Sequence, residues 1–336
     1  MTYNFCTLFD SNYLTRGLAL YYSLEKRCTD FHLYIFAFDK KSYQVLKKIN
    51  LSKATIISLT EFEDEELLKV KPARNKAEYC WTSTSSTILY VLQKYKVEMC
   101  TYLDADIFFY SSPKPIFDEL GSKSILITEH RYSHQYNKEV KSGKYCVQFI
   151  TFKNDEYGLK ALKWWRERCI EWCFARYEDG KFGDQLYLDD WTERFEGVHV
   201  LQHLGGGLAS WNVQQYEFSK ENNRLIGIEN QSGKKFDVIF YHFHYLKFFT
   251  NGKVELGRRL LSKSVIDIYY KPYIRELDKL KSQIQPLDES INSNGLTKQP
   301  ISWKTPILFL YRKAKGVYNI FDYDEMIADS QANFCH

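Results

Sequence analysis

The residues best suited to chemistry are two aspartates placed inside an apolar stretch. Asp104 and Asp106 occur in YLDADIFF (residues 102–109), with one small residue between them. Two carboxylates in apolar surroundings are costly unless a positive charge offsets them, and a divalent cation does so because hard cations bind oxygen ligands. A cation that also binds two phosphate oxygens neutralises the charge that develops as a nucleoside diphosphate leaves. The pattern is short, so a pair of turn aspartates at a strand end is the alternative.

A second candidate lies at the start of the chain, where FCTLFDSNY (residues 5–13) precedes Arg16 and Gly17. An apolar strand that ends in polar residues and a helix N-terminus can bind a base and a ribose through main-chain and side-chain hydrogen bonds. Many strand–helix units begin in this way, so the segment by itself does not identify a nucleotide site.

Two later segments carry groups that can bind sugars, phosphates or a metal. In KFGDQ (residues 181–185), Asp184 and Gln185 are suited to sugar hydroxyls, although an aspartate in a glycine-flanked turn is as often a helix cap. In YHFHYLK (residues 241–247), the two histidines alternate, so both point to one face of an extended chain. An imidazole and a lysine ammonium in one segment can serve a metal ion and a diphosphate, with a structural histidine as the alternative.

The elements expected from the sequence bring these segments to one edge of a sheet. Strands separated by helices over residues 1–110 indicate a parallel sheet with helices on its faces. Ligands bind at the carboxyl ends of strands in such sheets, and both Asp10 and Asp104 follow expected strands. The expected strands are 3–9, 32–38, 55–58 and 99–103, and the expected helices are 14–26, 41–49 and 83–95.

The remainder of the chain is expected to be less regular. Long charged helices are expected beyond about residue 257, interrupted by a polar segment, 286–300, that we expect to be mobile. The other expected elements are strands at 124–127 and 238–241, a tryptophan-rich helix at 157–177 and a glycine turn at 205–207.

Composition narrows the class of protein. The chain has 336 residues, of which 44% are hydrophobic and 26% charged, as is typical of globular proteins. The net charge of +4 is spread along the chain, unlike the concentrated basic surface of a nucleic-acid-binding protein. No stretch approaches the roughly 20 apolar residues that span a bilayer, and no signal-peptide pattern follows Met1, so we expect a cytoplasmic protein. The eight cysteines contain no CxxC pair and are expected to be buried free thiols.

The order and spacing of the four candidate segments resemble those of the family 8 glycosyltransferases, which have the GT-A fold. Residues 7–17 are similar to the family's nucleotide-binding strand and loop, and YLDAD (residues 102–106) is similar to its metal motif. The DQ pair at 184–185 resembles the family's Asp-Gln pair, and His242 resembles its C-terminal metal histidine. The resemblance covers about residues 3–247 and is closer still to a bacterial surface-polysaccharide subgroup. The segments that recur in that subgroup are YCWT (79–82), WWRE (164–167), GDQ (183–185) and the stretch from His203 to Trp211-Asn212.

The resemblance implies an α/β protein with the GT-A (Rossmann-like) nucleotide-diphospho-sugar transferase fold, a mixed central sheet and a helical C-terminal extension. The implied catalytic domain is 1–256, with a nucleotide-binding half over about 1–110 and an acceptor-binding half over about 111–256. Residues 257–336 would form the extension.

The same resemblance implies a role for each candidate residue. The implied ligands of Mn²⁺ or Mg²⁺ are Asp104, Asp106 and His242. The implied nucleotide is a uridine nucleotide. The residues implied to line it or to face its phosphates are Thr7, Leu8, Asp10, Tyr13, Arg74, Lys76, Asp104 and Lys247. The residues implied to contact the donor sugar or the acceptor are Gln148, Asp184, Trp211 and Asn212. Asp184, on the donor sugar, and Gln185, beside the anomeric carbon, are the implied catalytic pair.

The implied activity is a metal-dependent transfer of a hexose from a UDP-sugar to a glycan or lipid-linked glycan, with retention of configuration, in surface polysaccharide or lipopolysaccharide synthesis. Two departures from the family pattern bear on it. The family has Asn and then Gly where this chain has YCVQ (145–148), so Gln148 is the candidate to replace the missing amide. Tyr245 stands where the family has glycine, and the gap to Lys247 is one residue shorter.

Two other classes fit parts of the sequence. A nucleotide-sugar-binding protein of the same fold that lacks turnover is consistent with both departures. A haloacid-dehalogenase-type phosphatase would use Asp104 as nucleophile and Asp106 as acid. Such motifs usually open a chain, however, and they carry Thr or Val where Phe108 stands.

The C-terminal tail indicates a contact outside the catalytic domain. Residues 303–321 combine five aromatic residues with lysines and arginine and contain no acidic residue. A basic aromatic segment of this kind can lie on the anionic inner face of a membrane. The alternative is an amphipathic helix that packs on the catalytic domain.

Overall fold

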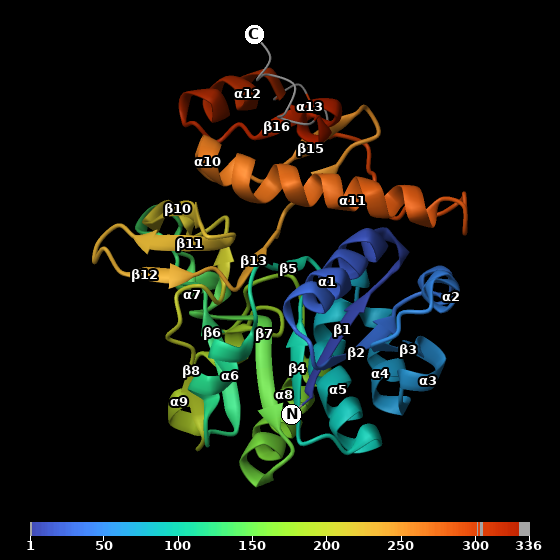
Figure 1. Cartoon of the computed structure of the whole chain (residues 1–336). Helices are drawn as coiled ribbons and strands as arrows, with labels where there is room; N and C mark the ends of the chain where they lie inside the picture. Colours follow the sequence, from blue (N-terminus) through green and yellow to red (C-terminus); the bar gives the residue numbers. More distant parts are fainter. Residues whose placement is uncertain (1, 301, 303–304, 329–336) are drawn as a thin grey trace.

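The computed structural model describes residues 2–300, 302 and 305–328 and shows a sheet covered by helices on both faces (Figure 1). The central sheet has seven strands in the order β3-β2-β1-β4-β7-β6-β8. β7 runs antiparallel to β4 and β6, and the other neighbouring pairs are parallel, so the sheet is mixed. Its strands are β1 (Tyr3–Phe9), β2 (Phe31–Ala37), β3 (Ala54–Ser58), β4 (Met99–Leu103), β6 (Ile125–Glu129), β7 (Tyr145–Lys153) and β8 (Val198–Val200).

Alternating side chains of the central strands bury two apolar cores, one on each face of the sheet. In β1, Phe5 and Phe9 belong to the first core, whereas Cys6 and Leu8 belong to the second. This follows from strand geometry, because successive side chains point to opposite faces. Since both faces are covered by helices, the strands are apolar along most of their length instead of alternating with polar residues.

The two cores are covered by different helices. The first core is covered by α1 (Leu14–Arg27), α2 (Lys40–Ile49) and α6 (Lys114–Leu120), together with helices from the C-terminal part of the chain. The second core is covered by α5 (Lys76–Tyr95) and α8 (Glu156–Glu171), together with the short α3 (Leu59–Phe62), α4 (Glu65–Val70) and α9 (Trp191–Arg194). The described cysteines are all free thiols, and all except Cys80 are buried, as expected.

Local hydrogen bonds move two helix ends away from their expected positions. α5 begins at Lys76 and not at Ser83, because Asn75 and Glu78 form a capping box in which each side chain accepts from the other's main-chain N–H. The tryptophan-rich helix α8 ends at Glu171, where the backbone of Trp172 becomes extended, and does not continue to residue 177.

Three smaller sheets adjoin the central one. The first joins β5 (Ile107–Phe109), β13 (Phe240–His242) and β9 (Leu208–Ala209), and it links the segment after Asp106 to the one that contains His242. The second is an antiparallel meander of β10 (Tyr216–Glu221), β11 (Arg224–Glu229) and β12 (Lys235–Asp237). The third consists of β14 (Lys247–Phe248), β15 (Lys253–Glu255) and β16 (Ile320–Asp322).

The C-terminal elements, orange to red in Figure 1, gather on one side of the molecule. α11 packs against both α1 and α13, and β16 adds a strand to β15, so the tail is part of the fold. No helix within the described residues is both long and apolar enough to cross a bilayer. The remaining helices are α7 (Glu139–Ser142), α10 (Lys263–Val265), α11 (Lys271–Ile284), α12 (Thr305–Ala314) and α13 (Tyr323–Ile327). Of these, α10, α11 and α13 add buried residues to the first core.

The expectation that 286–300 is mobile is wrong, because polar side chains of α1 hold this segment. The Thr15 hydroxyl is 2.6 Å from Asn294 Oδ1 and 3.0 Å from the Ser293 carbonyl. The buried Arg16 guanidinium donates to the Asn294 carbonyl at 3.1 Å. A composition rich in Ser and Asn is polar, but here Ser293 and Asn294 are satisfied by α1, and Asn292 bonds to Leu296 within the segment.

The close approach of α1 to β1 predicts the effect of one substitution. A Cβ at Gly17 would lie 2.2 Å from the ring of the buried Phe9. Overpacking a core costs about 1–3 kcal/mol, which exceeds the ~0.5–1 kcal/mol that alanine gains over glycine inside a helix. Gly17→Ala should therefore lower the free energy of unfolding in urea denaturation. Lys26→Ala, on the exposed side of α1, should change it by less than about 0.5 kcal/mol, and an equally stable Gly17→Ala protein would contradict the packing.

Candidate functional site

Two strands that are far apart in the sequence bring the aspartate pair to a histidine. β5 follows Asp106 directly and pairs antiparallel with β13, so that Ile107 lies opposite His242. The Nε2 atom of His242 is 3.1 Å from Asp106 Oδ1 and 3.6 Å from Asp104 Oδ2. Asp106 and His242 are both buried. The three residues expected to bind a metal therefore converge at one point.

Gln148 determines how this histidine is oriented. Its Oε1 atom lies 2.7 Å from His242 Nδ1, and because an amide oxygen only accepts, Nδ1 carries the proton of that bond. Nε2 is thereby directed at the carboxylates. The main-chain carbonyl of Gln148 also accepts from the Asp104 N–H at 3.0 Å. One residue of β7 thus holds two of the three converging groups.

The charges of this cluster fit a divalent cation. Burial raises the pKa of Asp104 to about 6. Burial also opposes ionisation of Asp106, but His242 outweighs it and lowers the pKa of Asp106 to about 2. Two carboxylates beside one imidazole leave a negative charge that the protein offsets only in part. Carboxylate oxygens and imidazole nitrogen are ligands of Mn²⁺, and carboxylates are ligands of Mg²⁺, so these residues fit either ion.

Asp184 is held in a buried position by a tryptophan of α8. Trp165 Nε1 donates to the main-chain carbonyl of Asp184 at 2.8 Å. Trp165 belongs to the WWRE segment, so that segment helps to position Asp184. Burial raises the pKa of Asp184 to about 8, and the charge of Asp104 adds to the shift. At neutral pH the Asp184 carboxyl is therefore mostly protonated and can donate a hydrogen bond.

Thr7 and Leu8, at the end of β1, face opposite sides of the sheet. Thr7 is fully buried, and its Oγ1 atom has no hydrogen-bond partner among the described residues. The side chain of Leu8 packs in the second core, so only its main chain is available to a ligand. An unpaired buried hydroxyl is uncommon in folded proteins, and Thr7 therefore stands out at this strand end.

The loop after β1 brings several expected nucleotide residues together. Asp10 accepts from the main-chain N–H of Asn12 at 2.9 Å and so caps the short helix Ser11–Tyr13. Lys76 Nζ, at the start of α5, lies 3.8 Å from Asp10 Oδ2. The Tyr13 ring is 41% exposed and lies 4.5 Å from the Arg16 guanidinium. The ring has an open face while the arginine fixes its position.

Three other expected residues make contacts elsewhere. The Arg74 guanidinium lies 3.8 Å from the Phe174 ring and donates to the Ile170 carbonyl at 3.3 Å. The amide of Gln185 donates to the Ser142 carbonyl. Lys247 is exposed on β14, where it pairs with Glu255 in the strand register. In the part of the chain that the structure describes, none of the three forms a hydrogen bond or an ion pair with Asp104 or Asp106.

Trp211 and Asn212 hold the loop that covers the cluster. Trp211 Nε1 donates to the His130 carbonyl at 2.8 Å, and its ring meets His242 edge-on with centroids 5.4 Å apart. The Asn212 amide donates to the His130 and Gly207 carbonyls, each at 2.9 Å, and its oxygen accepts from a main-chain N–H three residues earlier. Trp211 forms a wall of the cluster, whereas the hydrogen-bonding groups of Asn212 are used within the protein.

His244 lies outside the expected ligand set, yet it joins the cluster. One ligand atom each of Asp106, His242 and His244 lie within 4.8 Å of one another. Burial lowers the pKa of His244 to about 3, and His242 adds to the shift, so the imidazole is neutral. The sequence signal was the alternation of His242 and His244, which places both rings on one face of the strand.

Arg259, in the link between β15 and α10, is a second residue that the sequence did not indicate. Its side chain is 8% exposed, and it donates to the Ser210 hydroxyl at 3.1 Å. The guanidinium lies 5.7 Å from the Trp211 ring and 5.4 Å from the Tyr245 ring. Within the described ranges no carboxylate pairs with it. No local pattern marks this residue, because its neighbours come from distant segments.

Tyr245 adopts a backbone conformation that favours glycine. Its φ angle is +71°, in the left-handed region, which costs other residues about 1–2 kcal/mol. The family pattern has glycine at this position. The replacement at Tyr245 therefore changes the side chain but not the handedness of the turn that follows the two histidines.

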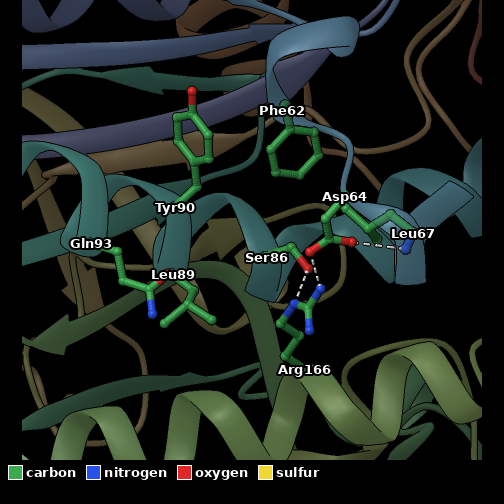
Figure 2. Close-up of a pocket in the computed structure, with 8 residues that line it drawn as sticks. All are labelled: Phe62, Asp64, Leu67, Ser86, Leu89, Tyr90, Gln93 and Arg166. Atoms are coloured by element: carbon green, nitrogen blue, oxygen red, sulfur yellow. Dashed lines mark hydrogen bonds and ion pairs between the residues drawn. The ribbon is translucent and has the colours of Figure 1, made fainter.

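A separate hollow of about 280 Å³ lies between α3, α4, α5 and α8, away from the aspartate pair (Figure 2). At its edge Arg166 forms ion pairs of 2.5 Å with Asp64 and with Glu66, and it donates to the Ser86 hydroxyl at 2.9 Å. These partners neutralise the guanidinium. Arg166 belongs to the WWRE segment, and its contacts join α8 to α4 and α5, so this part of the motif has a structural role.

Comparison with known proteins identifies relatives that match most of the chain. No family model matches it. The uncharacterized protein YfnD of Bacillus subtilis (strain 168) is 32% identical over 290 residues, which cover 84% of this chain and 91% of YfnD. The uncharacterized protein YfnF of the same strain is 31% identical over 300 residues, which cover 87% of this chain and 97% of YfnF.

Among solved structures, the galactosyltransferase LgtC in complex with donor and acceptor sugar analogs has a similar architecture. Its TM-score is 0.51, the match covers 82% of this chain and 95% of LgtC, and 10% of the residues are identical. At this identity the likeness concerns the fold alone. The expected fold class, an α/β GT-A fold with a mixed central sheet, is confirmed.

The protonated carboxyl of Asp184 predicts a pH-dependent stability. Its folded-state pKa of about 8 lies above the ordinary aspartate value, so between the two values the folded protein binds more protons than the unfolded chain. The contribution of Asp184 to stability therefore declines as pH rises through that window. As pH rises, the free energy of unfolding of Asp184→Asn should increase relative to that of the unchanged protein, by at most about 1.4 kcal/mol per pH unit.

Urea unfolding at about pH 5 and about pH 7.5, without metal, measures this difference. Asp118→Asn, on the exposed side of α6, serves as a control whose effect should be similar at both pH values. If Asp184→Asn changes the free energy of unfolding by the same amount at both pH values, Asp184 is ionised in the folded state and the prediction is wrong.

Proposed function

This chain belongs to the family of B. subtilis YfnD and YfnF and has the GT-A fold, and on this basis we propose that it is a metal-dependent glycosyltransferase. It transfers a hexose from a UDP-sugar to a glycan or lipid-linked glycan, with retention of configuration, in surface polysaccharide or lipopolysaccharide synthesis. The observation that carries the proposal is the convergence of Asp104, Asp106 and His242 at the end of β4.

A fold by itself does not determine chemistry, so the argument depends on this cluster. Bound Mn²⁺ or Mg²⁺ would supply positive charge where the diphosphate leaves. Asp104, Asp106 and His242 would hold the ion, and the 2.7 Å contact between Gln148 and His242 Nδ1 keeps Nε2 directed at it. The same cluster does not favour a phosphatase, because His242 lies against both carboxylates where a nucleophilic Asp104 would need a free approach.

The end of β1 would hold the nucleotide. The unpaired hydroxyl of Thr7, the main chain of Leu8 and the carboxylate of Asp10 offer hydrogen bonds to a base or ribose. The exposed Tyr13 ring offers a surface on which uracil can stack. The phosphates would be met by basic side chains. These are Lys76 and Lys247, both exposed, and Arg74, which would have to leave the Phe174 ring.

The sugars would lie against buried polar groups. The neutral Asp184 carboxyl can donate to a donor-sugar oxygen, and Gln185 would approach the anomeric carbon after leaving the Ser142 carbonyl. Gln148 has its oxygen on His242, while its Nε2 is buried without a partner among the described residues, so only this nitrogen is available to a sugar. Trp211 would contribute its ring, and Asn212 the loop geometry that positions Trp211.

A panel of nucleotide sugars, assayed for release of nucleoside diphosphate with and without Mn²⁺, tests the proposed activity. We expect one UDP-sugar to be turned over and a chelator to stop the reaction. Asp106→Asn removes a charged ligand and should lower the rate by about 100-fold or more. Asp118→Asn changes an exposed carboxylate on α6 and should leave the rate unchanged.

The outcomes separate an enzyme from a protein that only binds nucleotide sugars. If no donor is turned over but UDP and Mn²⁺ together raise the thermal unfolding temperature, the protein binds the nucleotide without catalysing transfer or release. If UDP and Mn²⁺ leave the unfolding temperature unchanged and no donor reacts, the glycosyltransferase proposal is wrong.

We also propose that the tail contacts the anionic inner face of a membrane. No residue of α12 is buried, and Ile307, Leu310 and Tyr311 are each at least 60% exposed. Lys313 and Lys315 are exposed and carry positive charge, whereas Arg312 pairs with Glu255 at 3.4 Å. An anionic lipid surface therefore complements the helix better than an apolar groove. Trp303, also expected to take part, lies outside the described residues. The exposure of α12 argues against the alternative, a helix that packs an apolar face on the catalytic domain, although Arg312 pairs with Glu255 of β15.

Sedimentation with vesicles that contain phosphatidylserine tests this contact. Replacing Ile307, Leu310 and Tyr311 with Ser should weaken binding by roughly tenfold or more, because burying each apolar side chain contributes on the order of 1 kcal/mol. Val140→Ser, at an exposed apolar residue of α7, is the matched control. Deleting the tail is less suitable, since β16 and the buried Met326 belong to the fold. Equal binding to phosphatidylcholine vesicles, or none to either, would contradict the proposal.

A further inference from the structure

His244 occupies a position that a metal ligand would require. One ligand atom of its ring lies within 4.8 Å of the corresponding atoms of both Asp106 and His242. Its ring centroid is 5.4 Å from that of His242, with the planes inclined by 66°. Two imidazoles this close, on the same side of a chain beside a buried carboxylate, can bind one ion together.

The ring nitrogens of His244 are not used by the protein. His242 bonds to Gln148, and His130, in the same cluster of rings, bonds to the Lys144 carbonyl. Among residues 2–300, 302 and 305–328, no group is hydrogen-bonded to either ring nitrogen of His244. His244 is partly buried, and its ring nitrogens are left available to an ion beside Asp106 and His242.

The surroundings of His244 hold it in this position. The Trp211 ring contacts both imidazoles, with centroids 5.4 Å from His242 and 5.7 Å from His244. The Tyr245 ring meets His244 edge-to-face, with centroids 3.9 Å apart, and Tyr245 takes the left-handed backbone conformation that turns the chain away after it. A strained residue that persists next to a group of potential ligands is typical of a functional site.

We infer that His244 is a further metal ligand, so that two carboxylates and two imidazoles bind the ion and select Mn²⁺ or Co²⁺ over Mg²⁺. The inference rests on the proposed function, whose metal centre it extends. Mg²⁺ binds oxygen ligands and retains its water, whereas imidazole suits later divalent metals. The four side chains would hold the ion and leave room for phosphate oxygens, so the extra imidazole would be compatible with donor binding.

Metal binding to the full-length protein, without any sugar substrate, tests the inference. Titration calorimetry with Mn²⁺, Co²⁺ and Mg²⁺ gives the order of affinities, and pulsed electron paramagnetic resonance of bound Mn²⁺ counts coordinated imidazole nitrogens. His244→Phe keeps an aromatic ring against Trp211 and Tyr245 but removes the lone pair. His134→Phe, at an exposed histidine, is the matched control, and thermal unfolding without metal shows whether each variant folds.

The intact protein and His134→Phe should show two coordinated imidazoles and bind Co²⁺ and Mn²⁺ more tightly than Mg²⁺. His244→Phe should show one imidazole, weaken Mn²⁺ binding by about tenfold or more, and lose most of the preference over Mg²⁺. One imidazole in the intact protein, with the same affinities in His244→Phe, overturns the role of His244 but leaves the proposed metal centre intact. No Mn²⁺ binding by the intact protein overturns both. Where the intact protein does bind Mn²⁺, Asp106→Asn should abolish that binding, which shows that the ion is held at the proposed centre.

Discussion

Two carboxylates placed in apolar surroundings need positive charge nearby, and this requirement organises the middle of the molecule. Asp104 and Asp106 follow β4, where β5 turns away to pair with β13. That pairing brings His242 to 3.1 Å from Asp106 across 136 positions of sequence (242 − 106). β7, the neighbour of β4, then supplies Gln148 behind the histidine. The register between the three-residue strands β5 and β13 thus decides whether His242 reaches the two aspartates.

The second core supports the same site from below the sheet. Trp165 of α8 lies fully buried and holds the Asp184 carbonyl, while the next residue, Arg166, joins α8 to α4 and α5. Two adjacent residues of α8 therefore have different tasks. Trp165 holds Asp184 in place, and Arg166 attaches α8 to its neighbouring helices. Because α8 is anchored in this way, it can keep the Asp184 side chain buried. Burial raises the pKa of that carboxyl above its value in water.

The C-terminal part of the chain is tied to the end of β1 through Arg16 of α1. Its guanidinium donates to the Leu246 carbonyl at 3.0 Å and to the Asn294 carbonyl at 3.1 Å. One buried side chain of α1 therefore links the turn after the two histidines with the polar segment before α12. This arrangement lets the tail and the cluster share a rigid frame, and it explains why a Ser- and Asn-rich segment is ordered against α1.

The sequence by itself determined the α/β class, most of the first strands and helices, and the aspartate pair with its histidine partner. Burial on both faces of a sheet and the periodicity of helices are local properties, so apolar patterns report them directly. The start of α5 was also encoded locally, in Asn75 and Glu78, although the apolar pattern did not reveal it. Only the tertiary structure decided that Gln148 orients His242, that Asn212 holds a loop, that Arg74 lies on Phe174 and that His244 joins the cluster. Each of these depends on partners from distant segments, because a hydrogen bond or ring contact is set by the packing of whole elements and not by the residues beside it in the chain.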